Sequence, residues 1–484
     1  MPRFDTVIRD GLVLVESQDD PITASIGISS GVVTAIGHDL DPVDAAEVIN
    51  AEGRLVLPGA VDGHFHLGIY RSIEEDTQTE TVTAAVGGTT SIISYFRTGS
   101  HYLERSGPYR EIFPEVLAAT RGRAHVDFGY HLAPMTDTHV TEMDWLVCEM
   151  GVSSFKFFWS YIGARMDSES ESYDAAFAYR IMEKVATLDE RLGDAGRVSL
   201  SVHCEDADLI SLFQQRADGI GLAPLGRYAA ARPALGEAIS ILRTGQMAAA
   251  TGAPVNLLHL SSEAAVTAVG QARALVPGHD IRAETAAHYL VLAGAFGESN
   301  LAKVNPPIRG QSDADALWAA VEDGRIDWLG SDHCCAMSEQ KAGEVWDAVP
   351  GFGGAALMYP TLVSKGYLER GIPLGRIVAL ASANPAKAYG CYGPKGRIGI
   401  GADADIVIFD PDADRTLASE QLHSAQDHSP YAGMDLRAWP VRTLLRGRTI
   451  ALDGRPVGEP TGRYLHRPLG AAVAAAPGTE AHGA

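Results

Sequence analysis

Two histidines separated by a single residue, His64 and His66, are the first residues in the chain whose types and spacing could support chemistry. They follow an apolar run, Arg54–Leu57, which is bounded by Pro58 and Gly59 and has the length of a buried strand. Side chains two residues apart on a strand point to the same face, so the two imidazoles could bind one divalent metal ion. An isolated His-x-His is more often a pair of hydrogen-bonded polar histidines. The metal interpretation therefore depends on what later strands supply.

A lysine in apolar surroundings is the next candidate. Lys156 lies in Ser154–Trp159, among phenylalanines and a tryptophan, where burial of an ammonium group would be costly. One explanation is a lysine that extends its charged end to the open end of the strands. The other is that desolvation and nearby metal ions keep the amine neutral, so that it adds carbon dioxide. The resulting carbamate could bridge two metal ions.

Three further candidates end strand-like runs. His203 ends Leu200–His203, His259 ends Asn256–His259, and Asp332 ends Trp328–Asp332. Either histidine alone would more often be a hydrogen-bonded core residue, whereas a buried carboxylate such as Asp332 is costly without a cation. Taken together, four histidines, one lysine and one aspartate at strand ends predict a site for two metal ions.

Alternating strand-like and helix-like segments must position these residues. Eight candidate strands, the first around Val56, are separated by intervals that leave room for a helix, which predicts a (β/α)8 barrel with its site at the C-terminal ends of the strands. The other seven begin at Thr90, His125, Ser154, Ser199, Val255, Ile281 and Ile326.

The sequence pattern of both chain ends differs from that of the predicted barrel. Short β-like segments separated by turn residues fill residues 4–50 and return at residues 405–409 and 441–446. We predict a small β-sandwich lobe from residues 1–57 and 394–462, a catalytic barrel from residues 58–393, and a tail from residues 463–484. The tail is rich in Ala and Gly from about Gly470 onward, and we expect it to be flexible or to pack on a neighbouring subunit.

Composition excludes several classes of protein. The 484 residues are 46% hydrophobic and 21% charged, as in an ordinary globular protein, and the net charge of −22 argues against nucleic acid or an anionic membrane as partner. We expect no signal peptide and no membrane span. The five cysteines are scattered without a C-x-x-C pair, which suits a reducing cytoplasm.

With these residues in place, the sequence resembles the cyclic amidohydrolases, which include dihydropyrimidinases, hydantoinases, allantoinases and dihydroorotases. The resemblance rests on five motifs: Pro58-Gly-x-Val-Asp-x-His-x-His66, Ser154-Phe-Lys156, Lys303–Arg309, Gly330-Ser-Asp-His-Cys334 and Gly401–Val407. It implies the same barrel and β-sandwich lobe, two divalent metal ions, most simply zinc, a carbamate on Lys156, and a homo-oligomer, either a tetramer or a dimer.

The resemblance also implies a mechanism. Two zinc ions would lower the pKa of a bridging water, and the resulting hydroxide would attack a ring amide carbonyl. Asp332 would take the proton from the water and deliver it to the leaving nitrogen. Tyr161 matches the tyrosine that donates to the oxyanion and contacts substrate, although a structural tyrosine at the barrel rim fits equally well. Asn305 is a candidate substrate contact, or a turn residue before Pro306.

Individual residues narrow the range of candidate substrates. Gly68 stands where dihydroorotases carry an arginine, so the closest resemblance is to dihydropyrimidinases and hydantoinases, which open a dihydropyrimidine or 5-substituted hydantoin to an N-carbamoyl amino acid. The alternative is an allantoinase or another cyclic-imide amidohydrolase, and His288 favours the allantoinase because it resembles the allantoinase form of its segment. The loop at residues 347–354 lacks the ring-contacting Asn of hydantoinases, and its Phe352 would offer an apolar pocket surface. A non-catalytic assembly protein fits less well, because all six ligand positions are filled.

Overall fold

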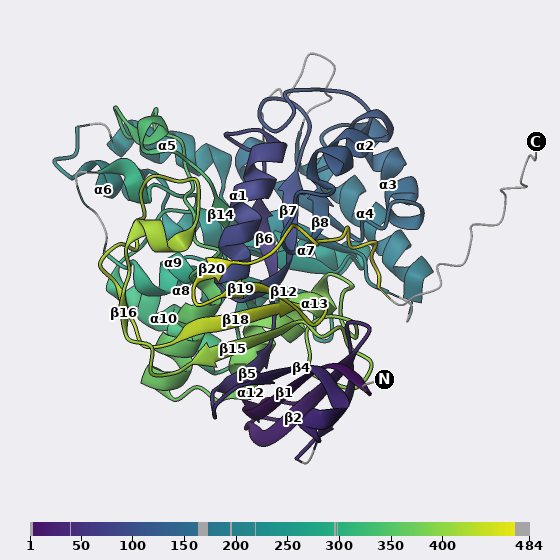
Figure 1. Ribbon diagram of the computed structural model, residues 1–484. Helices are drawn as coiled ribbons and strands as arrows, with labels where there is room; N and C mark the ends of the chain where they lie inside the picture. Colours follow the sequence, from purple (N-terminus) through teal and green to yellow (C-terminus); the bar gives the residue numbers. More distant parts are fainter. Residues whose placement is uncertain are drawn as a thin grey trace, which may run out of the picture.

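A ring of parallel strands forms the centre of the molecule (Figure 1). The computed structural model describes residues 3–38, 40–162, 173–193, 196–217, 219–294, 297 and 299–469. The strands are hydrogen-bonded in the order β13-β12-β11-β10-β9-β8-β7-β6-β14. They are β6 (Ala60–His66), β7 (Thr89–Phe96), β8 (Asp127–Leu132), β9 (Ser154–Phe158), β10 (Ser199–His203), β11 (Val255–Leu257), β12 (Ile281–Ala286), β13 (Trp328–Gly330) and β14 (His333–Cys334).

The eighth strand of the barrel is broken in two. The sequence predicts a single run that ends at Asp332, but the structure places Ser331 and Asp332 between β13 and β14. β13 pairs with β12, whereas β14 pairs with β6 through His333 and Phe65. The break therefore brings the sheet round to its first strand, and the predicted (β/α)8 barrel is confirmed. The prediction that Val56 belongs to the first barrel strand was wrong, because that strand is β6 and Val56 lies in the preceding strand β5 (Leu55–Pro58) of another sheet.

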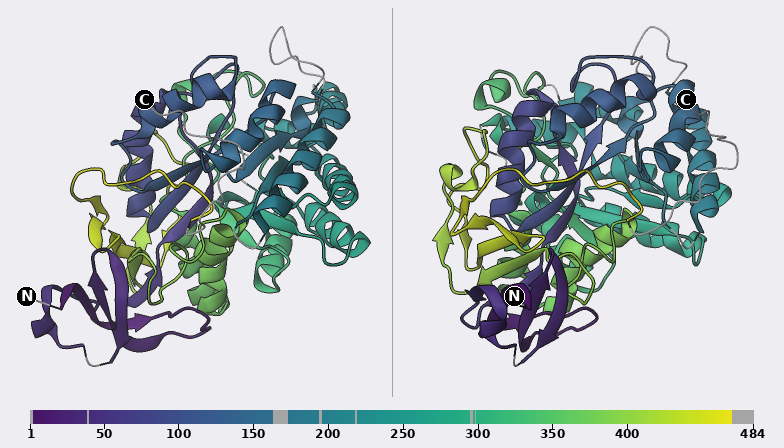
Figure 2. Two further views of the ribbon diagram at one scale, coloured as in Figure 1. Left: turned by 90° about the vertical axis from the view of Figure 1, so that its right-hand side faces the viewer. Right: turned by 45° about the vertical axis from the view of Figure 1, so that its right-hand side comes forward.

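Helices pack around the strands and connect them (Figures 1 and 2). They are α1 (Ile73–Val86), α2 (Tyr109–Thr120), α3 (Asp137–Cys148), α4 (Ala175–Leu192), α5 (Ala207–Ala217), α6 (Pro224–Ala231), α7 (Ala234–Thr251), α8 (Glu263–Leu275), α9 (Ala287–Val291), α10 (Gln311–Glu322), α11 (Met358–Thr361), α12 (Leu374–Val378) and α13 (Asn384–Ala388), with π-helical segments at Leu362–Leu368 and Ala379–Ala383. None of the described helices is both long enough and apolar enough to span a membrane.

Local sequence explains the first βα unit. Ser72 caps α1 by accepting from the N–H of Glu75, and the Glu75 side chain accepts in return from the N–H of Ser72. Gly88 has a φ of 86°, which lets the chain turn from α1 into β7 without a side-chain clash. Every residue of β7 is buried, as expected for a parallel strand covered on both faces.

A second sheet contains strands from both chain ends, and its N-terminal strands lie at the bottom of Figure 1. Its N-terminal strands are β1 (Phe4–Val13), β2 (Ile22–Ser29), β3 (Val32–Gly37), β4 (Ala45–Asn50) and β5 (Leu55–Pro58). Its later strands are β15 (Ile406–Asp410), β18 (Trp439–Leu445), β19 (Arg448–Leu452) and β20 (Arg455–Pro456), while β16 (Arg415–Thr416) and β17 (Asp435–Leu436) form a separate pair. β15 joins the two groups by pairing with β5 on one side and β18 on the other. The predicted domain boundaries themselves stay a prediction.

A buried ion cluster ties this sheet to the barrel. The ammonium of Lys395, which is 2% exposed, lies 2.5 Å from Asp127 at the start of β8, 2.7 Å from Asp405 and 2.8 Å from Asp403. Arg446, at the end of β18, also pairs with Asp127. Because an unpaired charge at this depth would be strongly destabilising, the two parts of the fold depend on each other.

Residues 463–469 correct the prediction for the tail. They pack on the chain's own barrel, where Tyr464 forms an isolated bridge with Phe128 of β8. Arg467 is fully buried and donates 2.8 Å from Nη1 to Ser154 Oγ. The rest of the predicted tail, residues 470–484, lies outside the described residues.

Candidate active site

All six predicted metal ligands line one cavity of about 230 Å³ at the C-terminal ends of the barrel strands. His64 and His66 end β6, Lys156 lies in β9 and His203 ends β10. His259 follows β11 by two residues, and Asp332 lies at the break between β13 and β14. Tyr161 and Asn305 line the same cavity.

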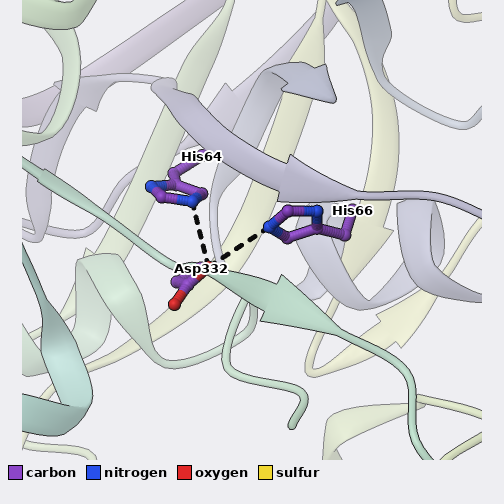
Figure 3. A group of neighbouring side chains, drawn as sticks. All are labelled: His64, His66 and Asp332. Carbon is purple, nitrogen blue, oxygen red and sulfur yellow. Dashed lines mark ion pairs between the residues drawn. The ribbon is translucent and has the colours of Figure 1, made fainter. Parts of the chain in front are cut away.

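His64, His66 and Asp332 are in direct contact (Figure 3). Asp332 Oδ1 lies 3.0 Å from His64 Nε2 and 3.3 Å from His66 Nε2. Burial alone would raise the pKa of Asp332, but the neighbouring His64 and His66 hold it well below its usual range. The carboxylate is therefore an anion that faces two imidazole nitrogens, a donor set suited to a divalent metal ion.

Glu284 on β12 orients His64 through Nδ1, the ring nitrogen that does not face Asp332. The Nδ1–H of His64 donates 2.5 Å to Glu284 Oε1, and Trp328 Nε1–H donates 2.7 Å to Glu284 Oε2. Burial lowers the pKa of His64, but the charges of Glu284 and Asp332 outweigh it and raise the value to about 9. A metal ion would compete with a proton for His64 Nε2, while Glu284 keeps Nδ1 protonated and turned away.

Lys156 is buried beside aromatic rings. It is 1% exposed, and its Nζ lies 4.4 Å from the ring centroid of Tyr95 and 4.8 Å from that of Phe158. Burial lowers the pKa of Lys156 to about 7, although the charges of Glu284 and Asp332 act in the opposite direction. A substantial neutral fraction at neutral pH makes the amine a nucleophile toward carbon dioxide.

His203 and His259 lie side by side in the cavity wall, with ring centroids 4.5 Å apart. His203 Nε2 lies 2.8 Å from Glu205, which also accepts a 2.6 Å hydrogen bond from Arg232. His259 is 2% exposed, and its Nδ1 is a buried nitrogen without a hydrogen-bond partner among the described residues. Burial lowers the pKa of His259 well below its usual range, so the ring is neutral and able to bind a metal ion.

The backbone is strained at two of these residues. His259 has a φ of 39° and Asp332 a φ of 49°, both in the left-handed region that non-glycine residues rarely adopt. Such conformations cost about 1–3 kcal/mol each and persist only where the surroundings enforce them. Here they coincide with the ends of β11 and β13, where the chain turns each side chain toward the cavity.

Tyr161 and Asn305 take different positions in the cavity wall. Tyr161 ends the short 3₁₀ turn η2 (Trp159–Tyr161), and its ring stacks on Phe158 with centroids 4.6 Å apart. The Oδ1 of Asn305 accepts a hydrogen bond from the Tyr228 hydroxyl. The Asn305 side chain is therefore already engaged on one side, whereas Tyr161 presents a phenol beside the predicted ligands.

Several cavity residues were not predicted from the sequence. The Tyr102 hydroxyl lies 3.2 Å from His66 Nδ1, and Arg97, Tyr70 and His101 also line the cavity. Arg97 could have been predicted as a cavity residue from the sequence, because it is a charged residue directly after the apolar run of β7. Lys156 was singled out for a similar reason, as a charged residue within the apolar run of β9. Tyr102 lies in a loop and carried no such signal.

The prediction for Phe352 was wrong. Its ring is 2% exposed and packs against His288 and Tyr431, with centroids 5.3 and 5.9 Å away. From the same loop, Pro350 and Gly351 line the cavity instead. A second chamber of about 330 Å³ shares Tyr70, His101, Asn305 and Pro350 with the first, so this loop separates two adjoining spaces.

Two other groups of acidic side chains are occupied by protein partners. Asp127, Asp403 and Asp405 surround the Lys395 ammonium. Glu80, which lies beside Asp76 and Cys335, accepts from His333 Nε2 at 2.9 Å and from Ser424 Oγ at 2.6 Å. Among the described residues, the cavity therefore holds the donor set best suited to a catalytic metal.

Comparisons with known proteins agree with this geometry. The profile of the amidohydrolase family matches residues 168–450. An allantoinase from Rubrobacter xylanophilus is 34% identical over 469 residues, covering 96% of this chain and 98% of its own. A D-hydantoinase from Ralstonia pickettii is 30% identical over 478 residues, covering 96% and 99%. The crystal structure of a dihydropyrimidinase from Brevibacillus agri superposes with a TM-score of 0.85 at 29% identity, covering 96% and 98%.

Proposed function

The chain belongs to the amidohydrolase family and is a hydrolase that acts on cyclic amides, and we propose that it opens a dihydropyrimidine or a 5-substituted hydantoin to an N-carbamoyl amino acid. The observation that carries this proposal is the convergence of His64, His66, Lys156 and Asp332, with His203 and His259, on one cavity. The relatives named for hydantoinase and dihydropyrimidinase activity support the choice of ring.

The residues present fit two divalent metal ions, which we infer to be zinc. The donors would be His64, His66, His203, His259, Asp332 and a carbamate on Lys156, and the unpartnered Nδ1 of His259 is consistent with such a role. When bound, the metals supply Lewis-acid polarisation of the carbonyl and a water of lowered pKa.

The chain's own residues would carry the protons. Asp332, held anionic by its neighbours, takes a proton from the attacking water as the new C–O bond forms. As the ring C–N bond breaks, Asp332 delivers that proton to the leaving nitrogen, so one water is consumed for each ring opened. The phenol of Tyr161 donates a hydrogen bond to the oxyanion, and Glu284 holds the orientation of His64 throughout.

Allantoin is the second candidate substrate. The allantoinase of Rubrobacter xylanophilus shares 34% identity with this chain, compared with 30% for the D-hydantoinase of Ralstonia pickettii. Both similarities extend over nearly the whole chain, so overall similarity does not separate the two activities.

A substrate panel tests the proposal. Protein supplied with zinc and bicarbonate is assayed with dihydrouracil, hydantoin, 5-substituted hydantoins and allantoin, with the Asp332→Asn variant as the inactive control. We expect turnover of a dihydropyrimidine or hydantoin that chelation abolishes. Turnover of allantoin alone would replace the proposal by the second candidate, and equal activity in metal-free protein would refute the mechanism. A cytoplasmic location and assembly into a homodimer or homotetramer stay predictions.

A further inference from the structure

Arg97 is a buried cation for which the mechanism has no use. It directly follows β7, is 8% exposed and lines the cavity that holds the predicted metal ligands. Its Nη1 donates 3.2 Å to the carbonyl of Thr98, and its guanidinium carbon lies 5.6 Å from the ring centroid of Tyr161. No carboxylate within the described part of the chain lies at ion-pair distance from it.

This arrangement is unusual on energetic grounds. A guanidinium remains charged at every physiological pH, and burying a charge is costly unless an anion compensates it. Two other buried cations have a compensating anion, since Lys395 faces three aspartates and Arg232 pairs with Glu205. The buried Arg467 instead donates to the Ser154 hydroxyl and to two backbone carbonyls. Among the described residues, the partners of the Arg97 guanidinium are the Tyr161 ring and the Thr98 carbonyl, so most of its five N–H donors have no acceptor there.

The neighbours of Arg97 place this charge at the reaction site. Tyr161, which it faces, is the proposed oxyanion donor. Tyr102, on the loop that follows Arg97, reaches His66 Nδ1. A ring held with its amide carbonyl between the metal ligands and Tyr161 would therefore carry its substituents within the same small cavity as the guanidinium.

We propose that Arg97 selects cyclic amides that carry a carboxylate substituent, by binding that carboxylate with its free N–H donors. The proposal rests on the proposed function, because it concerns the substrate of the same site. It depends on a strand-end arginine and not on the position two residues after His66, where Gly68 has no side chain. The reaction is unchanged: one water adds to the ring carbonyl, the C–N bond breaks, and the substituent carboxylate takes no part.

The test compares substrates that differ only in charge. Hydantoin-5-acetate is paired with hydantoin-5-acetamide, and dihydroorotate with its primary amide. Because a hydrogen bond to a charged group contributes about 1.5–3 kcal/mol, kcat/KM should favour the carboxylate of each pair by roughly 10- to 100-fold. Arg97→Met should abolish that ratio with unchanged zinc content, and Arg97→Lys should keep part of it. Arg105→Met, an exposed arginine paired with Glu115, is the matched control and should keep the full ratio.

A binding measurement separates failure of this inference from failure of the proposed function. Calorimetry with N-carbamoyl-aspartate and N-carbamoyl-asparagine should show tighter binding of the aspartate derivative to wild type and no difference in Arg97→Met. Hydrolysis of the neutral rings with kcat/KM equal to or above that of the carboxylates would overturn the role of Arg97 and leave the proposed function intact. If no ring is hydrolysed, the proposed function fails, and calorimetry alone then tests whether Arg97 binds a carboxylate. Equal binding of the two derivatives to wild type would overturn the inference.

Discussion

Replacing Glu284 by Gln should weaken metal binding without touching a metal ligand. The carboxylate accepts from the Nδ1–H of His64 at 2.5 Å and from Trp328 Nε1–H at 2.7 Å, and the His259 N–H lies 3.3 Å from its Oε1. Glutamine has nearly the same shape but only one accepting oxygen, so one of these donors must face an NH₂ group.

The size of the effect follows from these contacts. Hydrogen bonds to a charged acceptor contribute about 1.5–3 kcal/mol and neutral ones about 0.5–1.5 kcal/mol, so the two short bonds together lose roughly 2 kcal/mol. Part of that loss appears in the orientation and basicity of His64. Changes in residues that support a metal ligand typically lower metal affinity 10- to 100-fold, which corresponds to roughly 1.4–2.7 kcal/mol.

The assay is a zinc titration against a competing chelator, with kcat/KM measured at saturating zinc. Glu263→Gln, at the exposed start of α8, makes the same chemical change away from the cavity and should bind zinc like wild type. Circular dichroism confirms that both variants are folded. A folded Glu284→Gln protein with wild-type zinc affinity and activity would refute the argument that Glu284 positions His64.

Three further predictions concern other buried groups. Lys156→Ala should lose metal and activity, and added short-chain carboxylates should partly restore both; an unmodified Lys156 in active, metal-loaded protein, seen by mass spectrometry, would contradict the carbamate. Tyr161→Phe should lower kcat about 100-fold with unchanged zinc content, and an unchanged kcat would leave Tyr161 a structural residue. Burial raises the pKa of Glu80, but His333 and Ser424 outweigh it and lower the value to about 2. Ionised Glu80 therefore adds on the order of 3 kcal/mol to the free energy of unfolding above about pH 4.5, and this contribution is lost as the pH falls toward 2. In urea unfolding of metal-free protein, Glu80→Gln should flatten the dependence of the free energy of unfolding on pH between these values. An unchanged pH dependence in the variant would refute this role of Glu80.

The sequence predicted the barrel and the placement of the candidate ligands at strand ends because both follow from local pattern. Strand length, side-chain alternation and a polar residue at the end of an apolar run can be read without knowing which strands are neighbours. This is why His64, Lys156 and Asp332 could be assigned to one edge of a barrel before any contact was known.

Other parts of the site depend on contacts between distant residues. Glu284 lies within β12 like any strand residue, and its role appears only when His64 and Trp328 are seen beside it. Phe352 shows the same limit for loops, because a run of glycines gives no indication of which way an aromatic ring will turn. Residues 463–469 have no periodicity, yet Arg467 is fully buried through partners on β8 and β9.

The pairing of β15 with β5 has a consequence for how the chain is made. During synthesis, β1 to β5 leave the ribosome first, while the strand that pairs with β5 follows the entire barrel. Until then the hydrogen-bonding groups on that side of β5 have no strand partner, and an unpaired strand edge is prone to associate with other chains. Completion of this sheet must therefore be among the last steps of folding, and the nascent N-terminal strands are where protection by a chaperone would matter most.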